Sequence, residues 1–260
     1  MIELKNVSKH YGSKKALDAI NLTLEKGQIY GLLGHNGAGK STTIKILVDI
    51  IKQSSGEILI DGQSIDENRL AVKQRIAYVS DSPDLFLQLK AKEYWDFIAQ
   101  SYRISEVTYQ KKLKELVTLF DIESSQDQLI ETFSHGMRQK TFLIGALIAN
   151  PEIWILDEPM TGLDPQAAYD LKQMMLNHAA QGNIVLFSTH ALETAQELSH
   201  KLAILRKGQV LFEGSFNELQ AQYPGESLEM IYLKMAGRDA DLTEEKIVEE
   251  SGETNALDTH

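Results

Sequence analysis

The amino-acid sequence predicts an α/β fold with a mixed sheet at its core, and three observations support this prediction. Residues 28–33 and 152–156 are continuous apolar segments, which are typical of parallel strands buried on both faces. Residues 2–24 contain two segments that favour an N-terminal antiparallel β subdomain. From about Leu85 to Leu147 the apolar residues take helical spacing, which predicts a helical subdomain inserted between the strands.

The composition is that of an ordinary globular protein of 260 residues, with 43% apolar and 24% charged side chains. The absence of cysteine excludes disulfide bonds and thiolate metal sites. We find no signal peptide and no apolar run of roughly 18 residues, so we expect no membrane span in this chain.

Negative charge is concentrated at the C-terminal end of the chain. Of the formal net charge of −11, residues 237–260 account for −6, because they hold eight acidic and two basic side chains. We expect residues 236–260 to form a flexible acidic tail behind a domain of residues 1–235. The acidic balance of that domain argues against a nucleic-acid partner, which needs clustered lysine and arginine.

The strand at 28–33 leads into a glycine-rich loop that matches the pattern G-x-x-x-x-G-K-[ST]. The loop consists of Gly34, His35, Asn36, Gly37, Ala38, Gly39, Lys40 and Ser41. Glycines let backbone N–H groups approach a polyphosphate, Lys40 reaches the β- and γ-phosphates, and the Ser41 hydroxyl ligates Mg²⁺. A helix expected at 42–51, beginning with Thr42, directs its positive end at the same anion. A chance match is the alternative, but the strand–loop–helix context favours a nucleoside triphosphate site.

Upstream of this loop, strands are expected at 2–7 and 17–24, and the segment between them contains Tyr11 on an expected loop. An aromatic ring there is able to stack on a nucleotide base. Taken alone, however, a tyrosine on a loop more often packs at the protein surface than stacks on a base.

After the loop and its helix, two more strands are expected at 56–62 and 75–79, followed by helices. One helix is expected at 91–101, and others follow Ser105 and Ser134, which are suited to be N-caps. The free N–H groups at the start of a helix also bind anions, so Ser134 is open to both roles, capping and anion binding.

The buried strand at 152–156 delivers Asp157 and Glu158 at its C-terminal end, where open α/β sheets collect their ligands. One carboxylate of such a pair suits Mg²⁺ and the other suits a general base, although an acidic loop start is the alternative. Another strand, at 183–188, leads to His190, and this placement favours a functional role for the histidine over a structural one.

The remaining part of the domain is expected to form a hairpin and two short helices. The hairpin turns at Lys207-Gly208, and Ser215 with Glu218 forms a capping box at the start of a helix. An apolar segment at 228–235 completes the domain.

Together these motifs resemble those of the ATP-binding subunit of ATP-binding cassette (ABC) transporters, over residues 1 to about 235. Six segments carry the resemblance in the family's order: Tyr11 as the aromatic residue that stacks on adenine, Gly34–Ser41 as Walker A, Ser134–Met137 as the signature, Ile153–Glu158 as Walker B, Thr161–Asp164 as the D-loop and His190 as the switch histidine. The resemblance implies the fold of a P-loop NTPase of the ABC cassette type, with ATP and Mg²⁺ as its ligands.

The resemblance also implies a mechanism with two cassettes and a membrane partner. Two cassettes, most simply a homodimer, stack head to tail. Walker A of one and the signature of the other hold the same ATP, with Ser134 and Gly136 at the γ-phosphate. Asp157 helps to hold Mg²⁺, Glu158 polarises the attacking water, and His190 contacts the γ-phosphate. A multi-span permease subunit, docked by the helical subdomain, places the chain peripherally at the cytoplasmic face of the cell membrane.

Two departures from the family pattern narrow the resemblance. Asp81 stands where the family usually carries a glutamine that senses Mg²⁺, which makes this shorter acidic side chain a candidate metal ligand. The signature has His135 and Met137 in place of the usual glycine and glutamine, but it keeps Ser134 and Gly136. Both features are similar to those of Ecs-type bacterial exporters, and that resemblance implies export of a peptide or another substrate.

Two other functions compete with a transporter ATPase. A soluble ABC-type ATPase acting on ribosomes or DNA usually has two cassettes or a long coiled coil, and this chain shows one cassette and no heptad run. A regulatory module with weak hydrolysis is disfavoured because Glu158 and His190 are both present. The sequence therefore favours an ATPase subunit that drives a membrane transporter.

Overall fold

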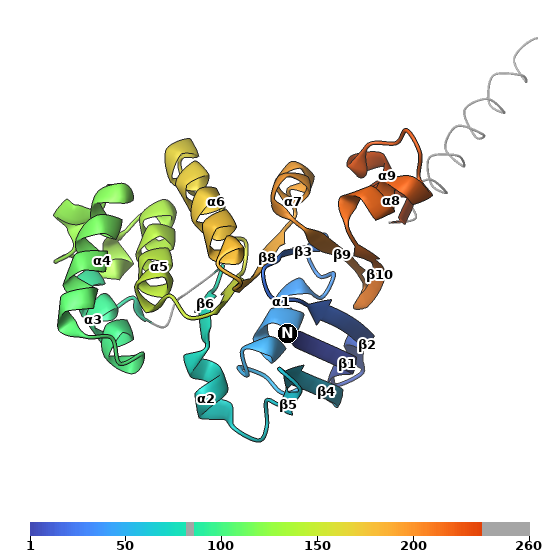
Figure 1. The fold of residues 1–260 in the computed structure, drawn as a ribbon, viewed down its shortest axis with the longest axis horizontal. Coiled ribbons are helices and arrows are strands. Elements are labelled where there is room, and N and C mark those ends of the chain that lie inside the picture. The colour runs from blue at the N-terminus through green and yellow to red at the C-terminus, as the bar shows by residue number, and fades with distance from the viewer. Residues whose placement is uncertain (82–85, 236–260) are drawn as a thin grey trace, which may run out of the picture.

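The computed structural model of the protein describes residues 1–81 and 86–235 (Figure 1). Residues 82–85, in the loop expected after the strand at 75–79, and the expected acidic tail at 236–260 lie outside the described residues. Across the two described ranges, no helix is both long enough and apolar enough to cross a membrane.

Six strands form a mixed sheet through the middle of the molecule (Figure 1). In spatial order they are β10 (Gln209–Gly214), β9 (Lys201–Arg206), β3 (Ile29–Leu33), β8 (Ile184–Thr189), β7 (Ile153–Leu156) and β6 (Ile76–Val79). The strands from β9 to β6 pair in parallel, and β10 runs antiparallel as the second arm of the predicted hairpin. The prediction of a mixed sheet is therefore confirmed.

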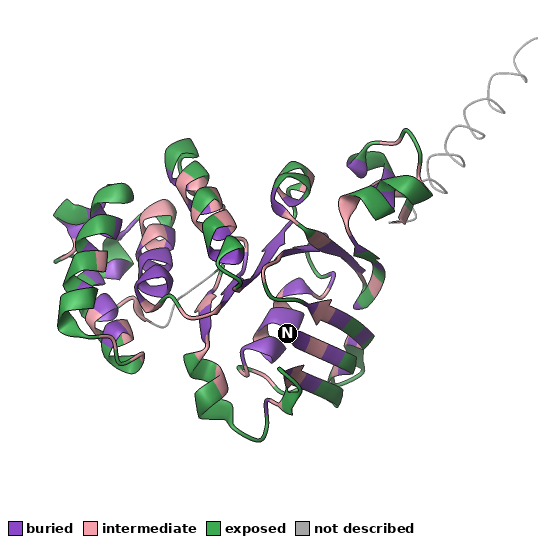
Figure 2. Cartoon of the chain, in the orientation of Figure 1, coloured by how far each residue is buried: buried purple, intermediate pink, exposed green. Residues whose placement is uncertain are grey.

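The central strands of this sheet are buried on both faces, and they appear in the buried colour in Figure 2. In β7, Ile153 and Ile155 pack into one core, whereas Trp154 and Leu156 pack into the core on the opposite face. This alternation explains the continuous apolar segments of the sequence, because a strand covered on both sides has no polar face.

A separate four-stranded antiparallel sheet contains the N-terminus (Figure 1). Its order is β2 (Lys14–Leu24), β1 (Ile2–Tyr11), β4 (Ser55–Ile60) and β5 (Gln63–Ser64). The first two strands are longer than expected, because β1 continues to pair with β2 across several register shifts until Tyr11 lies opposite Lys14. The expected loop placement of Tyr11 is therefore wrong: the residue ends a strand.

The helix α1 (Lys40–Leu47) is packed between the two sheets (Figure 1). Its side chains Ile44, Ile46 and Leu47 are buried in a core that they share with both sheets. The helix begins two residues before the expected Thr42 and ends at Leu47, because Asp49 adopts a left-handed conformation with φ 55° that turns the chain. The earlier start places Lys40 in the first turn of the helix.

Three helices lie together at one end of the mixed sheet, at the left of Figure 1: α3 (Ala91–Ser101), α4 (Glu106–Leu119) and α5 (His135–Ala149). The fully buried Trp95 joins α3 to α5, since its indole N–H donates a hydrogen bond to the Thr141 carbonyl oxygen at 2.9 Å. The predicted N-caps are confirmed, because Ser105 and Ser134 accept hydrogen bonds from N–H groups three residues further on, at 3.4 and 3.3 Å. Outer helix faces are exposed and inner faces are buried (Figure 2), which explains the helical spacing in the sequence.

The remaining helices cover two parts of the mixed sheet: the face opposite α1, and the edge formed by β10. They are α6 (Pro165–Ala180), α7 (Leu192–Leu198), α8 (Phe216–Gln222) and α9 (Leu228–Met235), with short 3₁₀ turns at Glu123–Ser125 and Ile130–Thr132 in the helical body. The predicted capping box at Ser215 is present. The sequence did not predict α7 or the six-residue α2 (Arg69–Gln74), and α2 buries none of its side chains, so it carries no apolar stripe.

His178 on α6 is an ionisable group inside the core. It is 3% exposed, and its ring stacks on Trp154 of β7 with 3.9 Å between the ring centroids. Burial lowers the pKa of His178 from 6.5 to about 4, so the ring is neutral in the folded chain near neutral pH. In the unfolded chain the ring binds a proton below about pH 6.5, and acid therefore favours unfolding.

We predict that, through His178 alone, the free energy of unfolding falls by about 2 kcal/mol between about pH 7.5 and about pH 5. The loss occurs between the two pKa values, where the unfolded chain holds a proton that the folded chain lacks. Urea denaturation at both pH values measures it, and a His178→Phe variant should lose about 2 kcal/mol less than the wild type. Parallel losses in the two proteins would contradict a neutral, buried His178.

Candidate functional site

Four neighbouring parallel strands bring the candidate residues to one edge of the mixed sheet. The glycine-rich loop follows β3, His190 follows β8, Asp157 and Glu158 follow β7, and Asp81 comes two residues after β6. Because the strands are adjacent in the order β3, β8, β7, β6, their C-terminal ends lie side by side. One sheet edge therefore carries residues from four distant parts of the sequence.

The glycine-rich loop is a tight backbone turn that ends in α1. Gly39 has a φ of 116°, and a Cβ atom there would lie 2.8 Å from Leu17 Cδ2, so the position requires glycine. Ala38, also in the loop, is fully buried. Lys40 is 6% exposed, and its Nζ donates a hydrogen bond to the Gly34 carbonyl oxygen at 2.5 Å. The loop thus combines a nearly buried cation with the N–H groups of a helix start, and both favour an anionic ligand.

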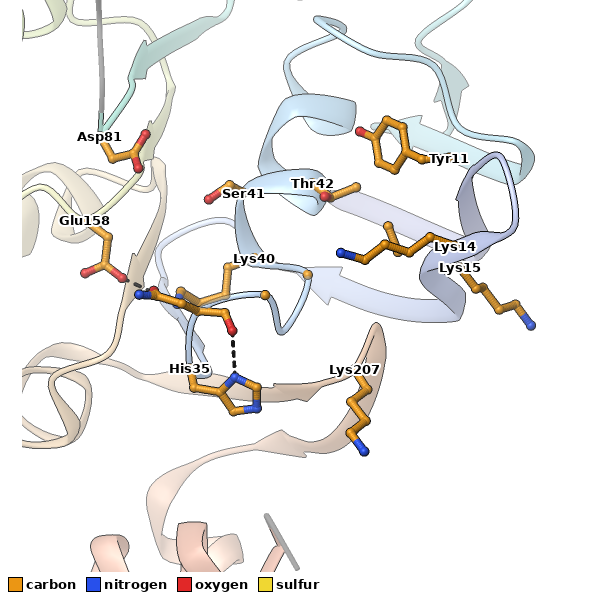
Figure 3. A pocket seen from close by; sticks show the side chains of 14 residues that line it. Tyr11, Lys14, Lys15, His35, Lys40, Ser41, Thr42, Asp81, Glu158 and Lys207 are labelled. Atoms are coloured by element: carbon orange, nitrogen blue, oxygen red, sulfur yellow. Dashed lines mark hydrogen bonds and ion pairs between the residues drawn. The ribbon is translucent and has the colours of Figure 1, made fainter.

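A pocket of about 360 Å³ opens beside this loop (Figure 3). Its lining consists of Tyr11, Lys14, Lys15, Ala16, His35, Asn36, Gly37, Gly39, Lys40, Ser41, Thr42, Asp81, Glu158 and Lys207. In Figure 3, Tyr11 lies at one end of the pocket and Glu158 and Asp81 lie at the other. The arrangement fits an elongated ligand with an aromatic base at one end and phosphates at the other.

Three lysines of the pocket were not singled out from the sequence. Lys14, at the start of β2, extends towards the loop in Figure 3, whereas Lys15 extends away and pairs with Asp18 at 2.5 Å. The third, Lys207, lies in the β9–β10 turn. No local pattern marks Lys14, because only the pairing of β1 with β2 brings it opposite Tyr11. Lys14 adds positive charge beside the loop, which favours a polyanion in a protein that is acidic as a whole.

Asp157 is completely buried at the end of β7. Ser188 on β8 donates a hydrogen bond to Asp157 Oδ1 at 2.5 Å, and the same hydroxyl accepts one from the Glu158 N–H at 2.9 Å. Within residues 1–81 and 86–235, Asp157 Oδ2 has no hydrogen-bond partner. Burial raises the pKa of Asp157, the hydrogen bond from Ser188 partly opposes this rise, and the nearby charges of Asp81 and Glu158 add to it. A buried carboxylate oxygen without a hydrogen-bond partner fits a divalent cation. Ser188, which the sequence analysis did not identify, orients the Asp157 carboxylate.

The residues at the pocket fit Mg²⁺ in combination with phosphate. In the part of the chain that the structure describes, no group of three or more histidine, aspartate or glutamate side chains is arranged to hold a metal. Proteins commonly bind Mg²⁺ through one or two carboxylates together with water and the phosphates of a substrate. The protein offers such a partial set of ligands in Asp157, Asp81 and the Ser41 hydroxyl, which leaves the other positions to water and phosphate.

Glu158 connects three segments of the sheet edge. Its backbone has a φ of 49°, a left-handed conformation that is uncommon for a residue with a side chain and that is frequent at functional sites. Its carboxylate is 16% exposed and lies 3.4 Å from Lys40 Nζ and 3.0 Å from His190 Nδ1. His190 is exposed and lies outside the pocket lining, so Glu158 is its link to the pocket.

Ser134 and Gly136 lie apart from this pocket, at the start of α5. Ser134 is the N-cap of that helix. Gly136 packs against the backbone of Gly162, and a Cβ atom at Gly136 would lie 2.4 Å from the Gly162 carbonyl oxygen. An ion pair between Lys140 and Asp164, with 2.7 Å between nitrogen and oxygen, joins the same two segments.

The structure thus divides the sequence-predicted residues into three groups. The first lines one pocket: Tyr11, Asn36, Gly37, Gly39, Lys40, Ser41, Thr42, Asp81 and Glu158. The second supports it from outside the lining: Gly34, Ala38, Asp157 and His190. The third, Ser134 and Gly136, belongs to a different surface of the same chain.

Comparison with known proteins identifies the family. The ABC transporter family matches residues 17–161, more than half of the chain. The ABC-type transporter ATP-binding protein EcsA of Bacillus subtilis is 33% identical over 242 residues, which cover 92% of this chain and 98% of that protein. The Nod factor export ATP-binding protein I of Burkholderia lata is 31% identical over 214 residues, which cover 82% of this chain and 70% of that protein.

Solved structures agree with this family. One, described as the ATP binding subunit of an ABC transporter, has a TM-score of 0.85 and 32% identity, and the match covers 91% of this chain and 99% of that one. Another is a dimeric ATP-binding cassette in a post-hydrolysis state with ADP and Pi. It has a TM-score of 0.74 and 26% identity, and the match covers 83% and 98% of the two chains. The family and the cassette fold predicted from the motifs are thereby confirmed, and the ribosome- or DNA-directed alternative is not favoured. The chain belongs to the ABC transporter family, as an ATP-binding subunit that hydrolyses ATP with Mg²⁺.

Proposed function

We propose that the protein is the ATPase subunit of a membrane exporter and that it acts as a homodimer around two molecules of ATP. The observation that carries the proposal is the pocket that joins Tyr11, the Gly34–Ser41 loop and Glu158 while leaving Ser134 and Gly136 outside it. Among the relatives, EcsA supports an Ecs-type transporter, and the Nod factor export protein supports export as the direction of transport.

ATP binding falls to residues arranged along the pocket. Tyr11, which is 50% exposed, offers its ring to the adenine base. The N–H groups of residues 36–42 and the Lys40 ammonium group bind the phosphates, and Lys14 adds a cation on the same side. This order along the pocket brings the γ-phosphate to Glu158.

Mg²⁺ would be held by the Ser41 hydroxyl, by Asp157 and by Asp81. When bound, the ion neutralises charge on the β- and γ-phosphates. Ser188 holds Asp157 Oδ1 and so leaves Oδ2 for the ion.

Glu158 polarises the attacking water. In the structure its carboxylate is held by Lys40 and His190, at 3.4 and 3.0 Å. When Lys40 binds the γ-phosphate, Glu158 loses one of these two partners and is able to accept a hydrogen bond from water. His190 turns from Glu158 to the γ-phosphate, and catalysis then rests on positioning and charge stabilisation.

Ser134 and Gly136 are assigned to the ATP of the second cassette, because they lie outside the pocket of their own chain. The Ser134 hydroxyl and the free N–H groups at the start of α5 suit a γ-phosphate. The helical subdomain of about residues 85–147, within a domain of residues 1–235, docks a multi-span permease. Exposed apolar side chains such as Phe97 and Val107 lie on that subdomain. The protein is then peripheral, at the cytoplasmic face of the membrane.

The variant Lys40→Ala should bind ATP roughly 10- to 100-fold more weakly than the wild type, because it removes a charge-assisted contact to phosphate. Titration with a fluorescent ATP analogue measures the dissociation constant. Lys45→Ala is the matched control, since Lys45 lies on the same helix but outside the pocket lining. Wild-type affinity in Lys40→Ala would contradict the assignment of the phosphate site.

The variant Glu158→Gln should lose turnover by roughly 10²- to 10⁴-fold, because it removes the group that polarises water. ATP binding should remain, since the amide no longer competes for Lys40. Phosphate release measures turnover, and Glu57→Gln, an exposed change in the antiparallel sheet, is the control. Size-exclusion chromatography of Glu158→Gln with ATP should show a dimer. A monomer at saturating ATP would count against the two-cassette site, and unchanged turnover against the role of Glu158.

The variant Asp81→Asn keeps the shape of the side chain and removes its charge. If Asp81 is a metal ligand, its loss should weaken Mg²⁺ binding roughly tenfold. The Mg²⁺ concentration for half-maximal hydrolysis should then rise by the same factor. Binding of ATP without Mg²⁺ should not weaken, since the change removes a negative charge that repels the phosphates. An unchanged Mg²⁺ requirement would remove Asp81 from the metal site, and Asp127→Asn, at an exposed position on the helical body, is the control.

A further inference from the structure

The last described helix, α9, makes a direct contact with the phosphate loop. The N–H of His35, the second residue of the loop, donates a hydrogen bond to the hydroxyl oxygen of Tyr232 on α9 at 2.8 Å. The two residues are 197 positions apart in the sequence. None of the motifs of the sequence includes Tyr232, and the mechanism proposed above does not use it.

The helix α9 is firmly attached to the sheet beside the loop. Leu228 and Ile231 are buried in a small core that also contains Leu33, the residue immediately before the loop. Arg206, the last residue of β9, donates a hydrogen bond to the Met235 carbonyl oxygen at 3.0 Å. Figure 1 shows α9 beside α8, next to the ends of β9 and β10. Tyr232 therefore lies on a helix that is both packed against the sheet and hydrogen-bonded to it.

One peptide group receives contacts on both sides. The Gly34–His35 peptide gives its N–H to Tyr232, and its carbonyl oxygen accepts the hydrogen bond from Lys40 Nζ at 2.5 Å. A peptide unit is planar, so fixing its N–H also fixes the direction of its carbonyl oxygen. Hydrogen bonds on opposite sides of a peptide also polarise one another. Tyr232 thus influences the position of the Lys40 ammonium group without touching it.

We propose that Tyr232 is a positioning residue for ATP binding, through which α9 holds the phosphate loop in the conformation that Lys40 requires. The inference rests on the proposed role of Lys40 at the phosphates. Loss of the Tyr232 hydroxyl lets the Gly34–His35 peptide rotate, and part of the ATP binding energy is then spent on ordering it again. The helix α9 thereby influences the nucleotide affinity of a site formed almost 200 residues earlier in the chain.

The test uses the full chain with Tyr232→Phe, which removes the hydroxyl and keeps the ring. The dissociation constants for ATP and ADP should rise about two- to tenfold, the fold-change for one lost hydrogen bond. KM should rise by the same factor with kcat unchanged, and the His35 amide hydrogen should exchange faster in the nucleotide-free protein. Tyr223→Phe is the matched control, because Tyr223 packs against the same small core and should change none of these values.

A second variant separates this hydrogen bond from general loosening of α9. Lys40→Ala removes the ammonium group through which Tyr232 is proposed to act, and it keeps both Tyr232 and the His35 N–H. In the Lys40→Ala background, Tyr232→Phe should weaken ATP binding no further, since the group that it positions is already lost. An equal loss in both backgrounds, or wild-type affinity and KM in Tyr232→Phe, would overturn the inference. Failure of the wild type to bind ATP would instead overturn the proposed function, because that result does not depend on Tyr232.

Discussion

The parallel pairing of β7 with β8 is the constraint on which the ATP site depends. It sets Leu156 opposite Phe187, so that Asp157 and Ser188, the next residue of each chain segment, meet through a hydrogen bond of 2.5 Å. The same hydroxyl accepts the Glu158 N–H. A shift of one residue in this register would send these side chains to the opposite faces of the sheet. The two cores that cover the strands therefore also fix the geometry of the acids.

The contact between Lys40 and Glu158 pairs the buried cation of the site with an anion of the same chain. Both side chains are largely buried, and a buried charge without a partner is costly. In the proposed mechanism, phosphate replaces Glu158 as the partner of Lys40, so the cation keeps an opposite charge at every stage. Glu158 then loses its contact with Lys40 only when a phosphate is present. Its carboxylate therefore becomes able to polarise water only when the substrate is bound.

The sequence predicted those parts of the site that follow from local pattern. The loop, the two acids after β7 and His190 could be placed because each follows an apolar strand, and parallel strands share one edge. Ser188 and Tyr232 were missed because their roles arise from contacts between distant segments, a strand pairing and a helix packed on the sheet. Lys14 was missed because its place beside Tyr11 depends on how far the β1–β2 hairpin continues to pair. The same reason explains Tyr11, whose strand extends only because β2 continues to pair with β1. The short α2 was missed because it buries no residue and leaves no apolar period to detect.

The close approach of Gly136 to Gly162 ties the turn that carries Ser134 to the segment just after Glu158. In the proposed homodimer, that turn faces the nucleotide of the partner, whereas Glu158 acts on the nucleotide of its own chain. A displacement of the Ser134 turn at one nucleotide would then move Glu158 at the other nucleotide. The two segments are joined by a backbone contact that has no room for a side chain. Hydrolysis at the two sites would then be coupled, because the state of the nucleotide in one site limits hydrolysis in the other.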